Sequence, residues 1–175
     1  TISTSPVTQA TEKKAYNYDV DADDIDPTRD VLSFTLLKGP TGMTLNKSTG
    51  LLQWTPGNQD VGVHSITLKV EDGQGGKDEQ SFNITVANVN DSPQITSTAV
   101  LDATEEKPYL YLVKASDPDP SKDTLVFSLE TSPKDMKLNP SNGLIEWTPT
   151  NADAEKSHPI KIKVEDGKGG SALQE

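Results

Sequence analysis

The chain has 175 residues, of which 27 are acidic and 16 are basic, so its formal net charge is −11. This acidity argues against binding to nucleic acid or to an anionic membrane surface, because both partners need clustered lysine and arginine. No apolar run approaches the ~20 residues of a membrane-spanning helix, and the absence of cysteine excludes disulfides, thiol nucleophiles and thiolate metal sites.

The first half of the chain predicts short antiparallel strands, because apolar and polar residues alternate there. Such a period of two is typical of strands that bury one face and leave the other in water. The clearest segments are residues 16–20, 32–36, 66–70 and 82–86. Asp-Pro, Asp-Gly and Gly-Gly pairs separate these segments and predict turns.

The second half repeats the first at an offset of about 93 residues. Residues 50–56 (GLLQWTP) return as 143–149 (GLIEWTP), and the alternating strand pattern returns at 109–113, 125–129 and 160–164. We therefore predict an all-β protein of two tandem Greek-key β-sandwiches, residues 1–91 and 92–175. We expect the second sandwich to lack its last strand, since the chain stops at Glu175, and we expect the chain to be a fragment of a larger protein.

Acidic residues gather in the loops at the strand ends. Asp117, Asp119 and Asp123 follow one predicted strand of the second repeat, and Asp72 and Asp166 each precede a glycine-rich turn. Clustered carboxylate oxygens on loops suit a hard cation, and calcium suits their flexible geometry better than magnesium does. Asp-Pro and Asp-Gly are also ordinary turn formers, so solvated turns are the alternative interpretation.

Four short motifs, which follow one another in the same order in both repeats, resemble motifs of cadherin repeats. In the first repeat they are residues 22–26 (ADDID), 48–51 (STGL), 70–73 (VEDG) and 88–93 (NVNDSP). The Trp-Thr-Pro segment and the Asp-Gly-x-Gly-Gly turn look more like the dystroglycan-type cadherin-like branch. That branch overlaps with the Putative Ig domain family of bacterial surface proteins.

The resemblance implies that calcium binds between consecutive domains. The residues at the matching positions are Glu12, Asp60, Asn88, Asn90, Asp91, Asp117, Asp119 and Asp166. A half-site shared with an upstream repeat would use Asp24, Asp26 and Asp72. Asn88 stands where the family has an acidic residue, so we expect weaker binding or fewer ions than in vertebrate cadherins.

These patterns favour a non-catalytic, extracellular or cell-surface module for adhesion or spacing, with calcium stiffening the junction between neighbouring repeats. The chain has only two histidines and no nucleophile motif, so we expect no enzyme. A protein adhesion partner, including another copy of the same protein, fits this role. The alternative is a polysaccharide-binding module in which Trp54 and Trp147 stack on sugar rings, whereas core positions are the ordinary role of such tryptophans.

Overall fold

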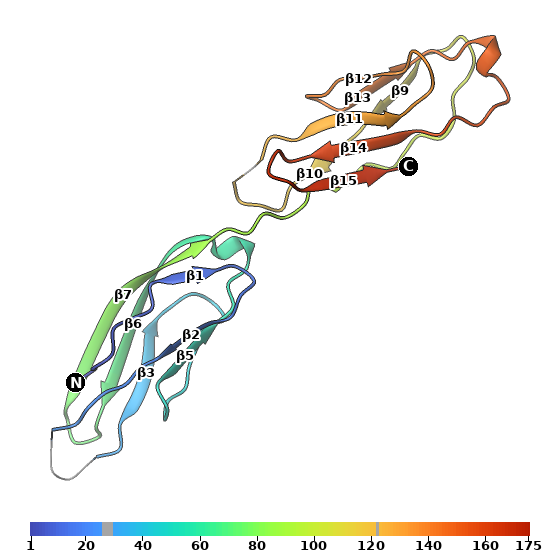
Figure 1. Cartoon of the computed structure of the whole chain (residues 1–175). Helices are drawn as coiled ribbons and strands as arrows, with labels where there is room; N and C mark the ends of the chain where they lie inside the picture. The colour runs from blue at the N-terminus through green and yellow to red at the C-terminus, as the bar shows by residue number, and fades with distance from the viewer. Residues whose placement is uncertain (26–29, 122) are drawn as a thin grey trace. The chain divides into compact units, whose positions relative to one another are not determined.

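The computed structural model describes residues 1–25, 30–121 and 123–175 (Figure 1). The chain separates into two compact units, Thr1–Val89 and Asn90–Glu175. The regular elements of each unit are strands, apart from one 3₁₀ turn in the described part of each, η1 (Asn58–Asp60) and η2 (Asn151–Asp153). Within the described ranges, no helix has the length and apolar character needed to cross a membrane.

Unit 1 is a β-sandwich of two sheets. One sheet has the order β1-β7-β6-β3 and the other β2-β5-β4. The strands are β1 (Gln9–Thr11), β2 (Tyr16–Asp19), β3 (Ser33–Lys38), β4 (Thr44–Leu45), β5 (Leu51–Trp54), β6 (Gly62–Glu71) and β7 (Lys77–Ala87). All neighbours are antiparallel except β1 and β7, which run parallel, with Ala10 opposite Val86.

The predicted alternation decides which side chains form the core of unit 1. Tyr18 and Leu52 come from one sheet and Leu68 and Ile84 from the other, and all four are buried in a single cluster. Burying an aliphatic side chain of this size contributes about 1.5–3 kcal/mol each. The polar residues between them face water, as a period of two requires.

Unit 2 repeats this plan with a less complete sheet. Its sheets have the orders β12-β13-β9, β11-β14-β15 and β10-β8. The strands are β8 (Gln94–Ile95), β9 (Tyr109–Leu112), β10 (Ala115–Ser116), β11 (Val126–Thr131), β12 (Lys137–Leu138), β13 (Leu144–Trp147), β14 (Lys161–Glu165) and β15 (Ser171–Gln174). Tyr111, Ile145, Ile162 and Val164 meet in its core.

The last strand of unit 2 is short. β15 has four residues and pairs with β14 only over Ile162–Glu165, whereas β7 of unit 1 has eleven residues. Beside it lies a pocket of about 430 Å³, lined among others by Leu101, Tyr109, Tyr111 and Ile160. In unit 1, the second half of β7 buries Ile84 and Val86 in the corresponding region.

Candidate functional site

Three carboxylates converge on the segment that follows β10 in unit 2. Oxygens of Asp117, Asp119 and Asp123 all lie within 4.8 Å of one another. Asp119 is 3% exposed, and the side chain of Asp123 is 4% exposed. Negative charges that lie this close together and are buried from water repel one another strongly unless a cation or hydrogen-bond donors compensate them.

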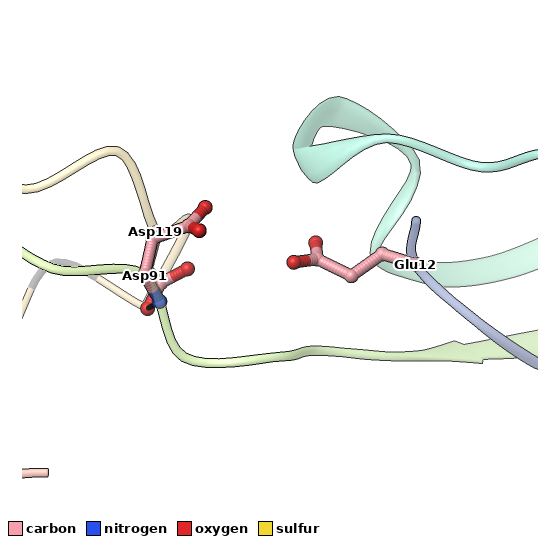
Figure 2. Close-up of side chains that lie close together, drawn as sticks. All are labelled: Glu12, Asp91 and Asp119. Carbon is pink, nitrogen blue, oxygen red and sulfur yellow. Dashed lines mark hydrogen bonds between the residues drawn. The ribbon is translucent and has the colours of Figure 1, made fainter. Parts of the chain in front are cut away.

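Backbone donors satisfy only part of this cluster. The Asp119 amide donates to Asp117 Oδ1 at 2.8 Å, and the amide of Asp91 donates to Asp119 Oδ2 at 3.0 Å. Figure 2 shows the side chains of Asp91 and Asp119 next to each other. Asp117 Oδ2, Asp119 Oδ1 and Asp123 Oδ2 are buried and accept no hydrogen bond from any residue that the structure describes. Buried acceptors of this kind are rare in folded proteins, and a bound cation would satisfy all three.

Asp166 lies in the loop after β14 and organises that loop. Its Oδ1 accepts hydrogen bonds from the amides of Lys168 at 2.6 Å and Gly170 at 3.0 Å, and its Oδ2 accepts one from Asn90 Nδ2 at 2.9 Å. The Asn90 hydrogen bond and the loop amides hold the pKa of Asp166 below its usual value. Asp166 therefore stays ionised and anchors Asn90, the first residue of unit 2.

Gly170 is required by this close packing. A Cβ atom at position 170 would lie 2.1 Å from Asp166 Oδ2 and 3.0 Å from the carbonyl oxygen of Asp91. Gly76 has the same relationship to Asp72 in unit 1, at 2.0 Å. The absence of a side chain at these glycines of the predicted turn thus allows the aspartate carboxylate to approach the backbone.

Two charged residues of this end of unit 2 were missing from the predicted ligand set. Asp123 contributes its carboxylate to the cluster, and Lys168 Nζ lies 2.5 Å from Asp123 Oδ1 and donates to Ser121 Oγ at 3.0 Å. The hydrogen bond to Asp123 raises the pKa of Lys168. The spacing of Asp117, Asp119 and Asp123 signalled the first residue, whereas no local pattern signalled the second.

The predicted ligands of unit 1 lie near its last residues. Glu12, whose side chain is drawn in Figure 2, follows β1. It is fully buried, and its amide donates to the Ala87 carbonyl at 3.1 Å. Lys13 Nζ lies 3.4 Å from Glu12 Oε1, so the side chain of Glu12 already has one cationic neighbour. Asn88 is exposed after the end of β7.

Asp60 serves a local structural purpose. It is the last residue of η1, and its Oδ2 accepts a hydrogen bond from the Gly57 amide at 2.8 Å. Asp153 plays the same part in η2, where its Oδ2 accepts from the amide and the hydroxyl of Thr150. Each carboxylate thus has one oxygen committed to its own turn.

The predicted upstream half-site lies at the opposite end of unit 1's β6 from η1. Asp24 and Asp72 line one pocket of about 300 Å³ together with Asp78. Asp72 Oδ1 accepts hydrogen bonds from the amides of Gln74 and Gly76. Asp26, the third predicted residue, lies outside the described residues.

The sequence signature of the Putative Ig domain family matches residues 1–87 and again 92–174. The chain belongs to this family. No curated protein matches the chain. The two matches correspond to the two compact sandwiches, so each unit is one Ig domain.

Cadherin repeats are among the solved structures similar to this chain. Mouse cadherin-23 EC22-24 is 18% identical with a TM-score of 0.61, and the match covers 95% of this chain and 62% of that one. Protocadherin gamma B2 extracellular cadherin domains 1-5 is 15% identical with a TM-score of 0.64, covering 95% and 36%. Human CDH23 EC21-23 is 18% identical with a TM-score of 0.61, covering 94% and 63%. The chain thus spans from about a third to under two thirds of these proteins and shares their fold.

The two tryptophans belong to the cores of the Ig domains. Trp54 is 4% exposed and Trp147 is 8% exposed. The Trp54 ring meets the His64 ring edge-on at 5.1 Å between centroids, and Trp147 meets His158 in the same way at 5.1 Å. Both rings pack as core residues in this structure, and their stacking on sugar rings stays a prediction.

Proposed function

We propose that the chain is a non-catalytic, calcium-binding module of a larger extracellular surface protein, serving adhesion or spacing. Calcium binds the carboxylates around the linker and stiffens the junction between successive domains. The observation that carries the proposal is that Asp119 Oδ1, a buried carboxylate oxygen beside two further carboxylates, has no hydrogen-bond donor among the described residues.

The chemistry of the donors favours calcium. Every side chain that we assign to the site offers oxygen, which excludes the nitrogen and sulfur sets typical of zinc or copper. Calcium accepts six to eight oxygens at flexible geometry, whereas magnesium requires a near-ideal octahedron. Asp117, Asp119 and Asp123 form the anionic centre of the proposed site. Its further proposed ligands are Glu12, Asp60, Asn88, Asn90, Asp91 and Asp166.

The linker contacts explain how an ion could order the junction. The Asp91 amide donates to Asp119, and Asn90 donates to Asp166, so the start of unit 2 is held by the same carboxylates that would hold the ion. An ion that binds only this ordered arrangement stabilises it by RT ln(1 + [L]/Kd), about 2.7 kcal/mol at a hundredfold excess over Kd. Neutralising the carboxylates also removes their mutual repulsion.

The two histidines support a non-catalytic role. His64 Nε2 donates to the Asp60 carbonyl at 2.6 Å, and His158 Nε2 donates to the Asp153 carbonyl at 3.1 Å. Both imidazoles are therefore engaged in fixing turns.

An extracellular location follows from the expected affinity, because calcium modules of this kind bind with Kd on the order of 10⁻⁴ to 10⁻³ M and fill only where calcium is millimolar.

Calorimetric titration of the full chain with calcium, and separately with magnesium, tests the proposal. We expect calcium binding in the sub-millimolar to millimolar range, weaker magnesium binding, and a higher Tm in calcium than in EDTA. Asp119→Asn should weaken calcium binding at least tenfold, because it removes a buried charge from the cluster. Asp135→Asn, at an exposed acidic residue of the same unit, is the matched control and should change nothing.

Small-angle scattering in EDTA and in calcium tests the stiffening. We expect a narrower distribution of inter-domain distances when calcium is present. Absence of calcium binding would show that calcium has no role in this chain. Equal calcium binding by the Asp119→Asn variant would show that the ion does not bind at the Asp119 cluster.

A further inference from the structure

Lys168 is one point at which the acidic ends of the two domains differ. The turn DGQGG at residues 72–76 returns as DGKGG at 166–170, so Gln74 of unit 1 corresponds to Lys168 of unit 2. The surrounding loop is the same in both units, since Asp72 and Asp166 each accept hydrogen bonds from the amides two and four residues later. Both loops therefore have the same backbone hydrogen bonds, and unit 2 adds an ammonium group to this arrangement.

The ammonium group of Lys168 reaches the carboxylate cluster. Nζ lies 2.5 Å from Asp123 Oδ1 and donates to Ser121 Oγ at 3.0 Å, and Ser121 in turn donates to Asp123 Oδ1 at 2.9 Å. The side chain of Asp123 is nearly fully buried, while that of Lys168 is about half exposed. Lys168 can thus swing out into water at little cost, whereas Asp123 cannot leave the cluster.

The cluster is only partly neutralised by this contact. Lys168 supplies one positive charge to three carboxylates, and Asp117 Oδ2 and Asp119 Oδ1 stay buried without donors among the described residues. A divalent ion would supply two charges. It could bind the free Oδ2 of Asp123 only with the Lys168 ammonium a few ångströms away on Oδ1, or bind both oxygens by displacing Lys168. At an effective dielectric constant near 20 such a neighbour opposes cation binding appreciably.

We infer that Lys168 is a tethered cation that competes with calcium for Asp123. It holds the cluster together when calcium is low and is displaced when calcium binds, which sets a low affinity for this site. The inference rests on the proposed calcium function. According to this inference, Lys168 sets the range of calcium concentration over which the linker becomes ordered.

The test compares Lys168→Gln, which copies Gln74 of unit 1, with the unchanged chain. We expect Lys168→Gln to bind calcium about tenfold more tightly by calorimetry and to show a lower Tm in EDTA. Lys168→Arg keeps the charge and should retain weak binding. Lys163→Gln is the matched control, because Lys163 makes a similarly short ion pair with Glu165, 2.6 Å, on β14. It should leave the calcium affinity unchanged.

The outcomes separate the two proposals. If the unchanged chain binds calcium and Lys168→Gln binds it no more tightly, the competition is wrong while the calcium function stands. If neither protein binds calcium, both are wrong. If calcium binds measurably only after Lys168→Gln, the competition is confirmed and the affinity assigned to the natural site is corrected downward.

Discussion

The side-chain amide of Asn90 donates a 2.9 Å hydrogen bond to Oδ2 of Asp166, which joins the first residue of unit 2 to a loop 76 positions later in the chain. This hydrogen bond orders the start of unit 2 without any bound ion. It fixes the direction in which the chain enters the second sandwich, and it keeps the Asp166 carboxylate ionised because its pKa is lowered.

Replacing Asn90 by alanine should make the first residues of unit 2 less ordered. In EDTA we expect the Tm of unit 2 to fall by about 5 °C, because a hydrogen bond to a charged acceptor is lost. Calcium binding should weaken as well, since the linker would no longer be held against the loop. Asn88→Ala, at an exposed residue two positions earlier, is the control and should leave the calcium-free Tm unchanged. Equal Tm values for both variants would show that the Asn90 contact does not order the linker.

Acidification should destabilise unit 2 through Asp153. The hydroxyl and amide of Thr150 hold the pKa of Asp153 below its ordinary value of 3.8. A carboxylate with a lowered pKa in the folded state stabilises the fold above its ordinary pKa, and this contribution is lost as the pH falls through the folded-state pKa. The Tm measured between pH 6 and pH 2.5 should therefore drop below about pH 4.

Asp153→Asn isolates that contribution. The variant should have a lower Tm at pH 7 and a smaller drop on acidification than the unchanged chain. Asp102→Asn, at an exposed acidic residue of unit 2, should follow the unchanged curve. A drop of the same size in Asp153→Asn would assign the acid sensitivity to other carboxylates.

Lengthening β15 should stabilise unit 2. Gln174 pairs with Ile162 as Gln80 pairs with Leu68, so residues added after Glu175 continue the strand in the register of β7. Adding the sequence of residues 82–88 (FNITVAN) would place its phenylalanine, isoleucine and valine over the pocket beside Tyr109 and Tyr111. Each buried apolar side chain contributes about 1.5–3 kcal/mol against the cost of ordering the strand.

We expect a higher Tm for unit 2 in the lengthened chain, measured by calorimetry. The control extension moves the alternation by one residue, which turns the apolar side chains to water while the backbone can still pair. If both extensions act alike, the pocket contributes nothing to the gain.

The strands were predictable because their physical cause is local. Tyr16, Tyr18, Leu68 and Ile84 alternate with polar neighbours, and the structure places all four in the core of unit 1. The same applies to the internal repeat, which predicted a second sandwich of the same plan. Both predictions are confirmed, because half-buried strands leave a period of two in any sequence that folds this way.

The details of the carboxylate cluster had no such local cause. The contact between Lys168 and Asp123 joins residues 45 positions apart, and only the packing of one loop on another brings them together. The sequence also gave no sign that Asp166 spends one oxygen on its own loop and the other on Asn90. Side-chain direction within loops depends on such long-range contacts, so the predicted ligand positions remain predictions.

The parallel pairing of β1 with β7 has a mechanical consequence. Gln9–Thr11 lie beside Thr85–Ala87, and the flanking Thr85 amide to Thr8 carbonyl and Glu12 amide to Ala87 carbonyl bonds extend the contact. When tension pulls residue 1 and residue 89 apart, these two parallel segments are drawn in opposite directions along their length. Their hydrogen bonds are then loaded together in shear, so they resist as a group instead of opening one after another.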